Sequence, residues 1–350
     1  MPGIIPLLEE RIKLIFPPEW FRQSGVQLTW PHIGTDWSEI IDEVTECYVA
    51  IAKEILKREK LLIVCPVEKE IINFFNEEEQ KNLRLVNVES NDTWARDHGA
   101  ISLFINDKPT IADFGFNAWG LKFPANHDNR ITRKLYELET FQKDVVYENL
   151  LDFILEGGSI ETDGNGTLMT TTECLLAPNR NQPMEKPQID AFLKKSFGVT
   201  NILWLDHGFL EGDDTDNHID TLARFCNERT IVYVKCEDEK DLHFNDLQKM
   251  EEQLKEFTDV DGNPYELIAL PMADAVYEDG GRLPATYANF LIINGAVLLP
   301  FYGSEKDMIA KSILQKVFPD REVIGIDCGS LIKQHGSLHC ITIQFPEGFL

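Results

Sequence analysis

The sequence predicts an α/β fold, and two observations carry this prediction. Segments with apolar residues at three- and four-residue spacing alternate with short, continuous apolar runs along the chain. Such alternation of helices with strands is typical of α/β proteins. Five polar or glycine-rich segments also stand beside apolar runs at intervals of about 50 to 70 residues, which suggests repeated supersecondary units.

The elements follow from these patterns in chain order. The helical spacing is clearest in WSEIIDEVTECYVAIAKEILKREK (37–60) and recurs near 131–143, 185–197, 246–257 and 305–317. Strands are expected in the apolar runs LLIVCPV, GAISLFI, TLMTT, NILWL, TIVYVKC, NFLIINGAVLLPF and CITIQF. The segment TDGNGT (162–167) is typical of a tight hairpin between two strands.

The five polar segments have a consequence for function. Their centres fall at Asp97, Ile160, Ile219, Asn289 and Cys340. If each belongs to one repeated unit arranged around a centre, one polar segment from each unit points at a common axis.

Composition restricts the partners. The formal charge of −26 disfavours nucleic acid and anionic membranes, because both would repel such a surface. The charge suits a small cationic substrate, or it serves only solubility. No apolar run is long enough to span a membrane, and the start MPGIIPLLEERIKL lacks the pattern of a signal peptide. Seven cysteines without a CxxC motif indicate reduced thiols and a cytoplasmic protein.

Cys340 is the first candidate for chemistry. It lies in HGSLHCIT (335–342), between His339 and an apolar run, and behind a turn that contains Gly336. A glycine turn lets the backbone approach a ligand closely. Cys340 is therefore a candidate nucleophile, although a metal ligand or a small apolar core residue is also compatible with the sequence. The other six cysteines are expected to fill the core.

A second candidate is GDDTDNHIDTLARF (212–225). In an extended stretch, His218 and Asp220 would point to the same side and could act as general acid/base and cation clamp. The spacing of a calcium loop is missing, and no partner for a zinc site is evident. A surface turn with helix-capping Asp and Thr residues is the structural alternative.

Two further segments add acidic and aromatic side chains. NDTWARDHG (91–99) brings Trp94, Arg96 and Asp97 together, and alternatively Trp94 is core and Asp97 pairs with Arg96. FILEGGSIETDGNGTLMTT (153–172) places Glu156 where a strand should end. It does not have the spacing or the following helix of a dinucleotide-binding fingerprint.

One reaction uses all of these residue types. Hydrolysis of a guanidinium group needs carboxylates that grip its N–H donors, a nucleophile for the central carbon and a proton donor for ammonia. Asp97 and Asp220 fit the clamps, Cys340 the nucleophile and His218 the acid/base, with Glu156 orienting His218 and Trp94 lying against the flat cation. The bound cation would favour the thiolate of Cys340. No metal or organic cofactor is needed.

At these residues the chain resembles a known family. WARD (94–97), EGGSIETDGNGT (156–167), LLAPNRN (175–181), DDTDNHID (213–220) and HGSLHCIT (335–342) are similar to motifs of the agmatine deiminase and bacterial-type peptidylarginine deiminase family. The resemblance implies one catalytic domain over residues 1–350, folded as a five-bladed α/β propeller of the pentein type with pseudo-fivefold ββαβ units. It implies the same roles for Asp97, Glu156, His218, Asp220 and Cys340, and it places Asp214 against the rest of the substrate.

The substrate and the class stay open at this point. Agmatine, a dication, would suit an acidic pocket with Asp213, Asp214 or Asp216 near its amine and would give N-carbamoylputrescine, as in putrescine biosynthesis. A peptidylarginine deiminase that acts on a C-terminal or internal arginine is the alternative. An enzyme for a carboxylate-bearing substrate would want a basic residue such as Arg180, Arg224 or Arg282 at the far end of the pocket. A transamidinase, a cysteine protease and a non-catalytic binding protein of the same fold are further alternatives, and a homo-oligomer is compatible with the sequence.

Overall fold

The computed structural model describes residues 12–66 and 68–350. The start of the chain, where the sequence predicts no signal peptide, is described only from Ile12 onward, and Val67 of the expected strand LLIVCPV also lies outside the described residues. Within the described ranges, no helix combines the length and the apolar character needed to cross a membrane.

The strands form five sheets of three or four strands and one two-stranded hairpin. The first sheet has the order β1 (Leu14–Ile15), β5 (Ile101–Ile105), β6 (Lys108–Gly115), β7 (Val146–Ile154). The second contains β8 (Ile160–Thr162), β9 (Thr167–Thr171) and β10 (Asn201–Leu205), and the third β11 (Ala223–Asn227), β12 (Thr230–Lys235) and β13 (Glu266–Pro271). The fourth contains β16 (Leu291–Ile293), β17 (Ala296–Phe301) and β18 (Glu322–Asp327), and β14 (Val276–Glu278) pairs with β15 (Gly281–Leu283).

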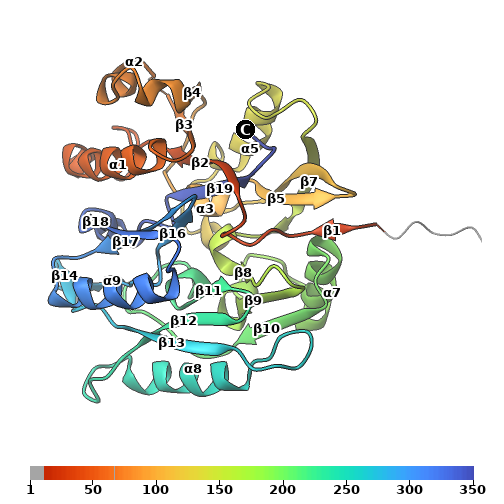
Figure 1. The fold of residues 1–350 in the computed structure, drawn as a ribbon, viewed down its shortest axis with the longest axis vertical. Helices are drawn as coiled ribbons and strands as arrows, with labels where there is room; N and C mark the ends of the chain where they lie inside the picture. Colours follow the sequence, from red (N-terminus) through yellow and green to blue (C-terminus); the bar gives the residue numbers. More distant parts are fainter. Residues whose placement is uncertain (1–11, 67) are drawn as a thin grey trace, which may run out of the picture.

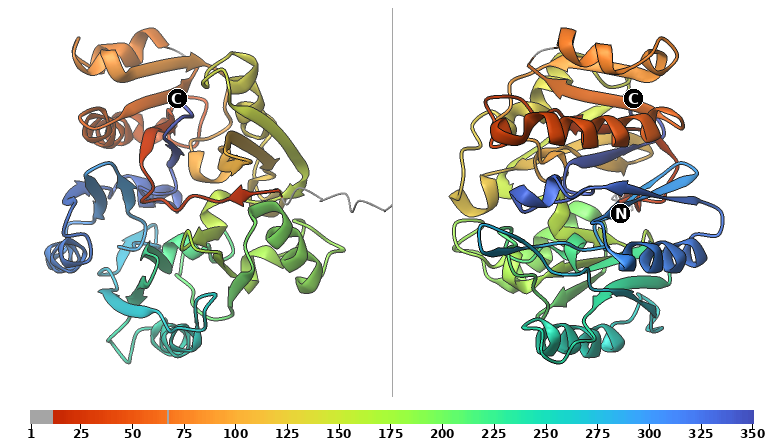
Figure 2. Two further views of the ribbon diagram at one scale, coloured as in Figure 1. Left: turned by 45° about the vertical axis from the view of Figure 1, so that its right-hand side comes forward. Right: turned by 90° about the vertical axis from the view of Figure 1, so that its left-hand side faces the viewer.

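The fifth sheet joins the two ends of the chain. Its order is β19 (Thr342–Pro346), β2 (Gln23–Thr29), β3 (Lys60–Cys65), β4 (Leu83–Asn87). All five sheets share one pattern, in which an antiparallel pair is followed by a parallel strand. The chain passes from one sheet to the next around the molecule, and β19 returns beside β2 (Figure 2).

The longer helices lie on the periphery (Figure 1). The α-helices are α1 (Ile41–Leu56), α2 (Glu68–Ile71), α3 (Ala95–His98), α4 (Ala118–Leu121), α5 (Ile131–Glu137), α6 (Thr172–Leu175), α7 (Lys186–Phe197), α8 (Phe244–Glu256) and α9 (Glu305–Val317). Short 3-10 turns are η1 (Ser38–Ile40), η2 (Ile72–Phe74), η3 (Glu79–Asn82), η4 (Asp128–Arg130), η5 (Gly157–Ser159), η6 (Ile219–Thr221) and η7 (Leu331–Gln334).

Local sequence explains the helices and their ends. Helix α1 buries Val44, Cys47, Tyr48, Ile51 and Ile55 on one face, as its three- and four-residue spacing predicts. Helices α7 and α9 each begin with a capping box. The helix expected near 131–143 is shorter than predicted. It ends at Glu137 because the chain turns through a left-handed residue at 139.

The mixed α/β class is confirmed by this alternation of strands and helices. The hairpin predicted at TDGNGT is also present, since β8 and β9 pair antiparallel across it. The seven cysteines are all buried, and none forms a disulfide in the part of the chain that the structure describes.

Candidate active site

The five polar segments occupy equivalent places in the five sheets. Each immediately precedes the first strand of an antiparallel pair, namely β5, β8, β11, β16 or β19. Within these segments α3 contacts η5 and β19, and η5 contacts η6. The segments centred on Asp97, Ile160, Ile219 and Cys340 therefore meet, although about 240 residues separate the first from the last.

Asp97, His218 and Asp220 converge at Gly158. Nδ1 of His218 lies 3.6 Å from Oδ1 of Asp97. A Cβ atom added to Gly158 would lie 2.7 Å from His218 Nδ1, 2.8 Å from Asp97 Oδ1 and 3.1 Å from Asp220 Oδ2. His218 and Asp220 do not share an extended strand as predicted, because residues 219–221 form the 3-10 turn η6. Both side chains are buried, so the surface-turn alternative is wrong for them.

Asp97 is held by two donors and not by Arg96. Its Oδ1 accepts a hydrogen bond from the Gly158 N–H at 3.0 Å, and its Oδ2 accepts one from Trp119 Nε1 at 3.0 Å. Arg96 donates instead to the carbonyl of His339 and lies 3.8 Å from Glu19. The predicted alternative of an Asp97–Arg96 pair is therefore wrong.

Cys340 lies in the turn between η7 and β19 and lines the same pocket as Asp97 and Trp94. Asn289 fixes this turn, because its Oδ1 accepts hydrogen bonds from the backbone N–H groups of His339 and Cys340. The Cys340 thiol donates to the same oxygen across 3.4 Å. Cys340 is 6% exposed, so it is covered but borders open space.

The pocket beside Cys340 is acidic and aromatic. Its lining consists of Asp36, Asp92, Trp94, Asp97, Trp119, Phe123, Asp214, Thr215, Gln334, His335, Gly336 and Cys340, with neither lysine nor arginine among these residues. Trp94 is fixed by donation from its Nε1 to Asp92. Gly336 permits close contact with Trp94, since a Cβ atom there would lie 2.1 Å from the indole ring. Of the three acids considered for a distal amine, only Asp214 lines the pocket.

The other acidic and basic residues that the sequence singled out form ion pairs with one another or hydrogen bonds with neighbouring residues. Asp213 accepts from Thr215 and from the Asn217 N–H, while Asp216 pairs with Arg180 at 2.6 Å. Arg180 also pairs with Glu156 at 3.0 Å, and both side chains are fully buried. Arg224 binds Glu19 and Glu161, and Arg282 binds Asp241. None of the three arginines predicted for a carboxylate-bearing substrate lines this pocket.

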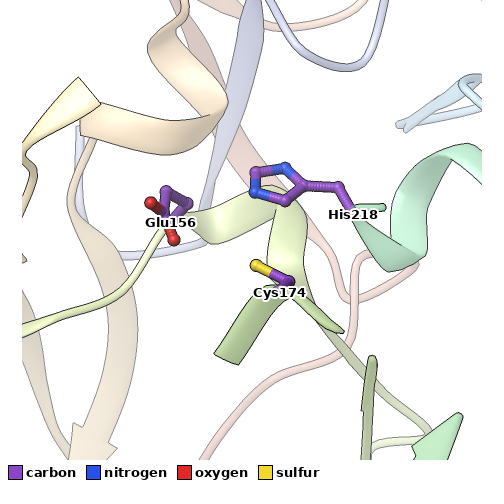
Figure 3. Close-up of side chains that lie close together, drawn as sticks. All are labelled: Glu156, Cys174 and His218. Carbon is purple, nitrogen blue, oxygen red and sulfur yellow. The ribbon is translucent and has the colours of Figure 1, made fainter. Parts of the chain in front are cut away.

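Glu156 lies close to His218, the residue that it is predicted to orient. A ring nitrogen of His218, a carboxylate oxygen of Glu156 and Sγ of Cys174 lie within 4.8 Å of one another (Figure 3). Figure 3 shows the imidazole ring directed between Glu156 and Cys174. These are three donor types that bind metals, but Arg180 already neutralises Glu156, so a cation would have to compete with an arginine.

The charges of the site follow from burial and from close partners. Burial raises the pKa of Asp97 to about 6, with His218 opposing this shift. Burial of His218 is outweighed by Asp97 and by Cys174 and Glu156, so the pKa of His218 lies well above its usual value. Burial of Asp220 is outweighed by its bond to His339, and its pKa falls. Burial, with Asp220 and Asp97, raises the pKa of the Cys340 thiol well above its usual value.

Two buried polar atoms of the site have no hydrogen-bond partner within the described residues. They are Oδ1 of Asp220 and Nε2 of His218, and the latter is the ring nitrogen on the side of Glu156 and Cys174, since Nδ1 faces Asp97. Leaving a buried polar group unpaired costs about 1–3 kcal/mol, so the Asp220 oxygen points to a ligand or a reaction. The Cys340 thiol and the Asp97 carboxylate thus line the pocket, and the His218 imidazole and the Asp220 carboxylate meet Asp97 at Gly158 without lining the pocket.

Three residues of the site were not predicted from the sequence. Asn289 was only the centre of the fourth polar segment, and its role as acceptor is visible only in the fold. Trp119 reaches Asp97 because residues 118–121 all have positive φ values, an arrangement that no local pattern predicts. Cys174 was expected to be core and is buried, but it also lies beside His218.

Comparison with known proteins agrees with this geometry. An agmatine deiminase from Pseudomonas aeruginosa is 32% identical, with 94% of this chain and 95% of that protein covered. A Porphyromonas gingivalis structure provisionally named an arginine deiminase is 56% identical, with a TM-score of 0.94 over 97% of this chain and all of that chain. A cysteine-to-serine variant of the C. jejuni agmatine deiminase with substrate bound is 39% identical, with a TM-score of 0.90 over 98% and 99% of the two chains.

The fold and the site together define a hydrolase of the guanidine-modifying class. A sequence model of the Porphyromonas-type peptidyl-arginine deiminase family matches residues 15–346. The chain belongs to this family, which confirms the resemblance seen in the motifs.

The space at Gly158 allows a direct test of the site geometry. Gly158→Ala would push a methyl group against His218 and Asp97, and a shift of about 1 Å in such a group can cost about 100-fold in rate. We expect kcat/KM for the guanidino substrate to fall about 10- to 100-fold with the fold retained. The control is Gly281→Ala, where the nearest atom to a new Cβ is 3.7 Å away. Equal activity of both variants would contradict the convergence at Gly158.

Proposed function

We propose that the protein hydrolyses agmatine to N-carbamoylputrescine and ammonia through a covalent amidino-cysteine intermediate. The observation that carries the proposal is the cluster of Asp97, His218 and Asp220 beside Cys340, in which Oδ1 of Asp220 makes no hydrogen bond within the described chain. A guanidinium group supplies N–H donors for both carboxylates and an electrophilic carbon for sulfur.

The reaction starts from a neutral thiol. In the free enzyme the raised pKa keeps Cys340 protonated, and the raised pKa of His218 keeps the imidazole charged. Binding of the cation between Asp97 and Asp220 offsets their negative charge, so the thiol releases its proton to solvent. Sulfur then attacks the guanidinium carbon and forms a tetrahedral adduct.

His218 acts as acid and then as base. It gives its proton to the departing nitrogen, so that ammonia leaves and an alkylthiouronium on Cys340 remains. The same ring then takes a proton from water, the oxygen attacks the carbon, and the C–S bond breaks. The hydroxyl proton of this second adduct passes to the departing sulfur, so the products are a ureido compound and the neutral thiol with which the reaction started. Ammonia takes up the proton that the thiol first released to solvent. Glu156, held by Arg180, supports the charge on His218, and Trp94 covers one side of the substrate.

The five sheets are proposed to be the blades of one propeller that makes up a single catalytic domain. Their shared strand pattern, the pairing of β19 with β2 and the meeting of the polar segments support this arrangement. The nucleophile and the clamps come from different sheets, so the site depends on the closed order of the units.

The choice of agmatine rests on charge at the pocket. Asp36, Asp92 and Asp214 line it in addition to Asp97, and no lysine or arginine does within the described chain. Burial, with repulsion from Asp213, raises the pKa of Asp214 to about 6, so a cation near Asp214 would relieve an unfavourable charge. A substrate with a second positive charge fits this lining, whereas a carboxylate would be repelled.

A substrate panel tests the proposal. We expect ammonia release from agmatine with kcat/KM at least about tenfold above that for free arginine or an arginine peptide, since one buried charge pair is worth more than about 1.4 kcal/mol. Asp214→Asn should reduce turnover of agmatine and spare butylguanidine, which lacks the amine. Preference for the peptide would instead support a peptidylarginine deiminase, and no turnover of any guanidino compound would support a binding protein.

A further inference from the structure

His339 connects the site to a buried network of charges behind it. Its Nδ1 lies 2.6 Å from Oδ2 of Asp220, and its Nε2 lies 2.7 Å from Oε2 of Glu19. The ring is 2% exposed. Glu19 also accepts from Arg224 at 2.8 Å and from the Ile292 N–H at 2.6 Å. The imidazole therefore spans two carboxylates that are both fixed.

Hydrogen bonding determines the protonation of this ring. An ionised carboxylate can only accept, so a nitrogen this close to one must carry a hydrogen. Burial of Glu19 is outweighed by Arg224 and His339, which hold the pKa of Glu19 well below its usual value. Asp220 is also ionised, because its pKa is lowered. Both ring nitrogens of His339 thus lie at hydrogen-bond distance from carboxylate oxygens, and both are placed to act as donors.

The contact leaves Asp220 with one oxygen for the substrate. Oδ2 is occupied by His339, whereas Oδ1 has no partner among the residues that the structure describes. The backbone of His339 is fixed as well, since its N–H donates to Asn289 at 2.9 Å. A displaced ring would therefore change the direction and the charge of the Asp220 carboxylate.

We infer that His339 is a positioning residue that keeps Asp220 ionised and aims its Oδ1 at the guanidinium group. The inference rests on the proposed function, in which Asp220 is one of the two clamps. His339 does not touch the reacting atoms but acts through Asp220. Glu19 and Arg224 hold the other side of the ring and so extend this support into neighbouring sheets.

The charges facing Asp220 come from every element packed around it. Those that favour its ionised form are His339, His218, Arg224 and Arg96, and those that oppose it are Asp97 and Cys340 if ionised. The carboxylates that face His339 are Asp220, Glu19 and Glu161. Removing His339 leaves Asp220 buried next to Asp97 with fewer positive charges around it. The pKa of Asp220 should therefore rise, so that this carboxylate becomes protonated at a higher pH than in the wild type.

The pH profile of His339→Gln tests the role. In the wild type, kcat/KM for butylguanidine, which lacks the amine that Asp214 would bind, should fall below about pH 6 with a slope of one, as Asp97 becomes protonated. In His339→Gln this acidic limb of the kcat/KM profile should move to higher pH by about one unit or more. Its slope should approach two, because Asp97 and Asp220 then both become protonated. At about pH 7 we expect kcat/KM of His339→Gln to be about tenfold or more below that of the wild type, and this difference should become smaller at about pH 9.

His243→Gln is the matched control. His243 is also buried and its Nδ1 lies 2.6 Å from Asp241, but it does not line the pocket. This control should lower the thermal midpoint and leave the pH limb in place. If His339→Gln lowered activity uniformly at all pH values without moving the limb, His339 would have no role through Asp220.

Two further experiments cover the case in which His339→Gln does not fold. The first is a second variant, and the second is a spectroscopic measurement on the wild type that needs no turnover. Glu19→Gln retains the shape of the network and should move the same limb in the same direction by less. In ¹⁵N-histidine-labelled wild type, both His339 nitrogens should carry hydrogen at neutral pH. A neutral ring would overturn the inference even if agmatine is hydrolysed, and an imidazolium would support it even if agmatine is not the substrate.

Discussion

Replacing Cys340 with serine is expected to abolish the ureido product while the protein stays folded. The loss in kcat should reach at least about 10⁴-fold, because an alcohol is a far weaker nucleophile than a thiolate. The sulfur donates to the Asn289 amide oxygen, and an amide is too weak a base to activate a hydroxyl group in its place. Ammonia release and mass spectrometry of the enzyme measure the effect.

The control for this change is another buried cysteine. Cys236 donates to the Asp238 carbonyl just after the end of β12, and a hydroxyl group could keep that bond. Cys236→Ser should keep kcat close to wild type, with a similar circular dichroism spectrum. Full turnover by Cys340→Ser, or an equal loss in the control, would contradict the assignment of the nucleophile.

The protonation state of Cys340 gives an independent check on the same residue. Because burial and two aspartates raise the pKa of this thiol, it should react slowly with iodoacetamide at neutral pH in the free enzyme. The rate should rise only well above about pH 9. Rapid alkylation at neutral pH would show a resident thiolate and would contradict activation of the thiol by the bound cation.

Much of the fold and the site was predictable because the signals were local. The spacing of apolar residues predicted the helices at 41–56, 186–197, 244–256 and 305–317 within a few residues. The five polar segments predicted a common centre; in the structure Asp97, His218 and Asp220 converge at Gly158, and Cys340 shares a pocket with Asp97. Short motifs sufficed here because each segment carries its own turn before a strand.

The parts that could not be predicted depend on contacts between distant residues. Glu19 and His339 are hydrogen-bonded although 320 positions separate them in the sequence, and no local pattern near either residue predicts the contact. The left-handed run that brings Trp119 to Asp97 and the turn η6 at Asp220 arise from packing, not from local propensity. For the same reason the sequence suggested Arg96 as a partner of Asp97, whereas tertiary contacts turn it toward Glu19.

The second large effect is expected from the clamps. Asp97→Asn or Asp220→Asn removes one negative charge from a buried site that must hold a cation. Breaking such a pair costs about 3–5 kcal/mol, which is about 150- to 5,000-fold in kcat/KM. Both variants should fold, because an asparagine has nearly the same shape as an aspartate.

Asp113→Asn is the matched control for both. Asp113 is buried on β6, accepts a hydrogen bond from Tyr147 and has a pKa that burial raises to about 6, as for Asp97. It does not line the pocket of Cys340. A loss of activity in this control equal to that of the clamp variants would mean that any buried carboxyl matters and that the clamps are not special.

The pH dependence separates the two clamps from each other. The pKa of Asp97 is raised, so its carboxylate is lost as the pH falls through about 6, whereas Asp220 has a lowered pKa and stays ionised in that range. With butylguanidine as the substrate, which has no amine for Asp214, the acidic limb of kcat/KM in the wild type therefore belongs to Asp97. It should disappear from the residual activity of Asp97→Asn and persist in Asp220→Asn. A limb that persists in Asp97→Asn, or an Asp97→Asn variant with wild-type kcat/KM, would refute the proposed grip on the guanidinium group.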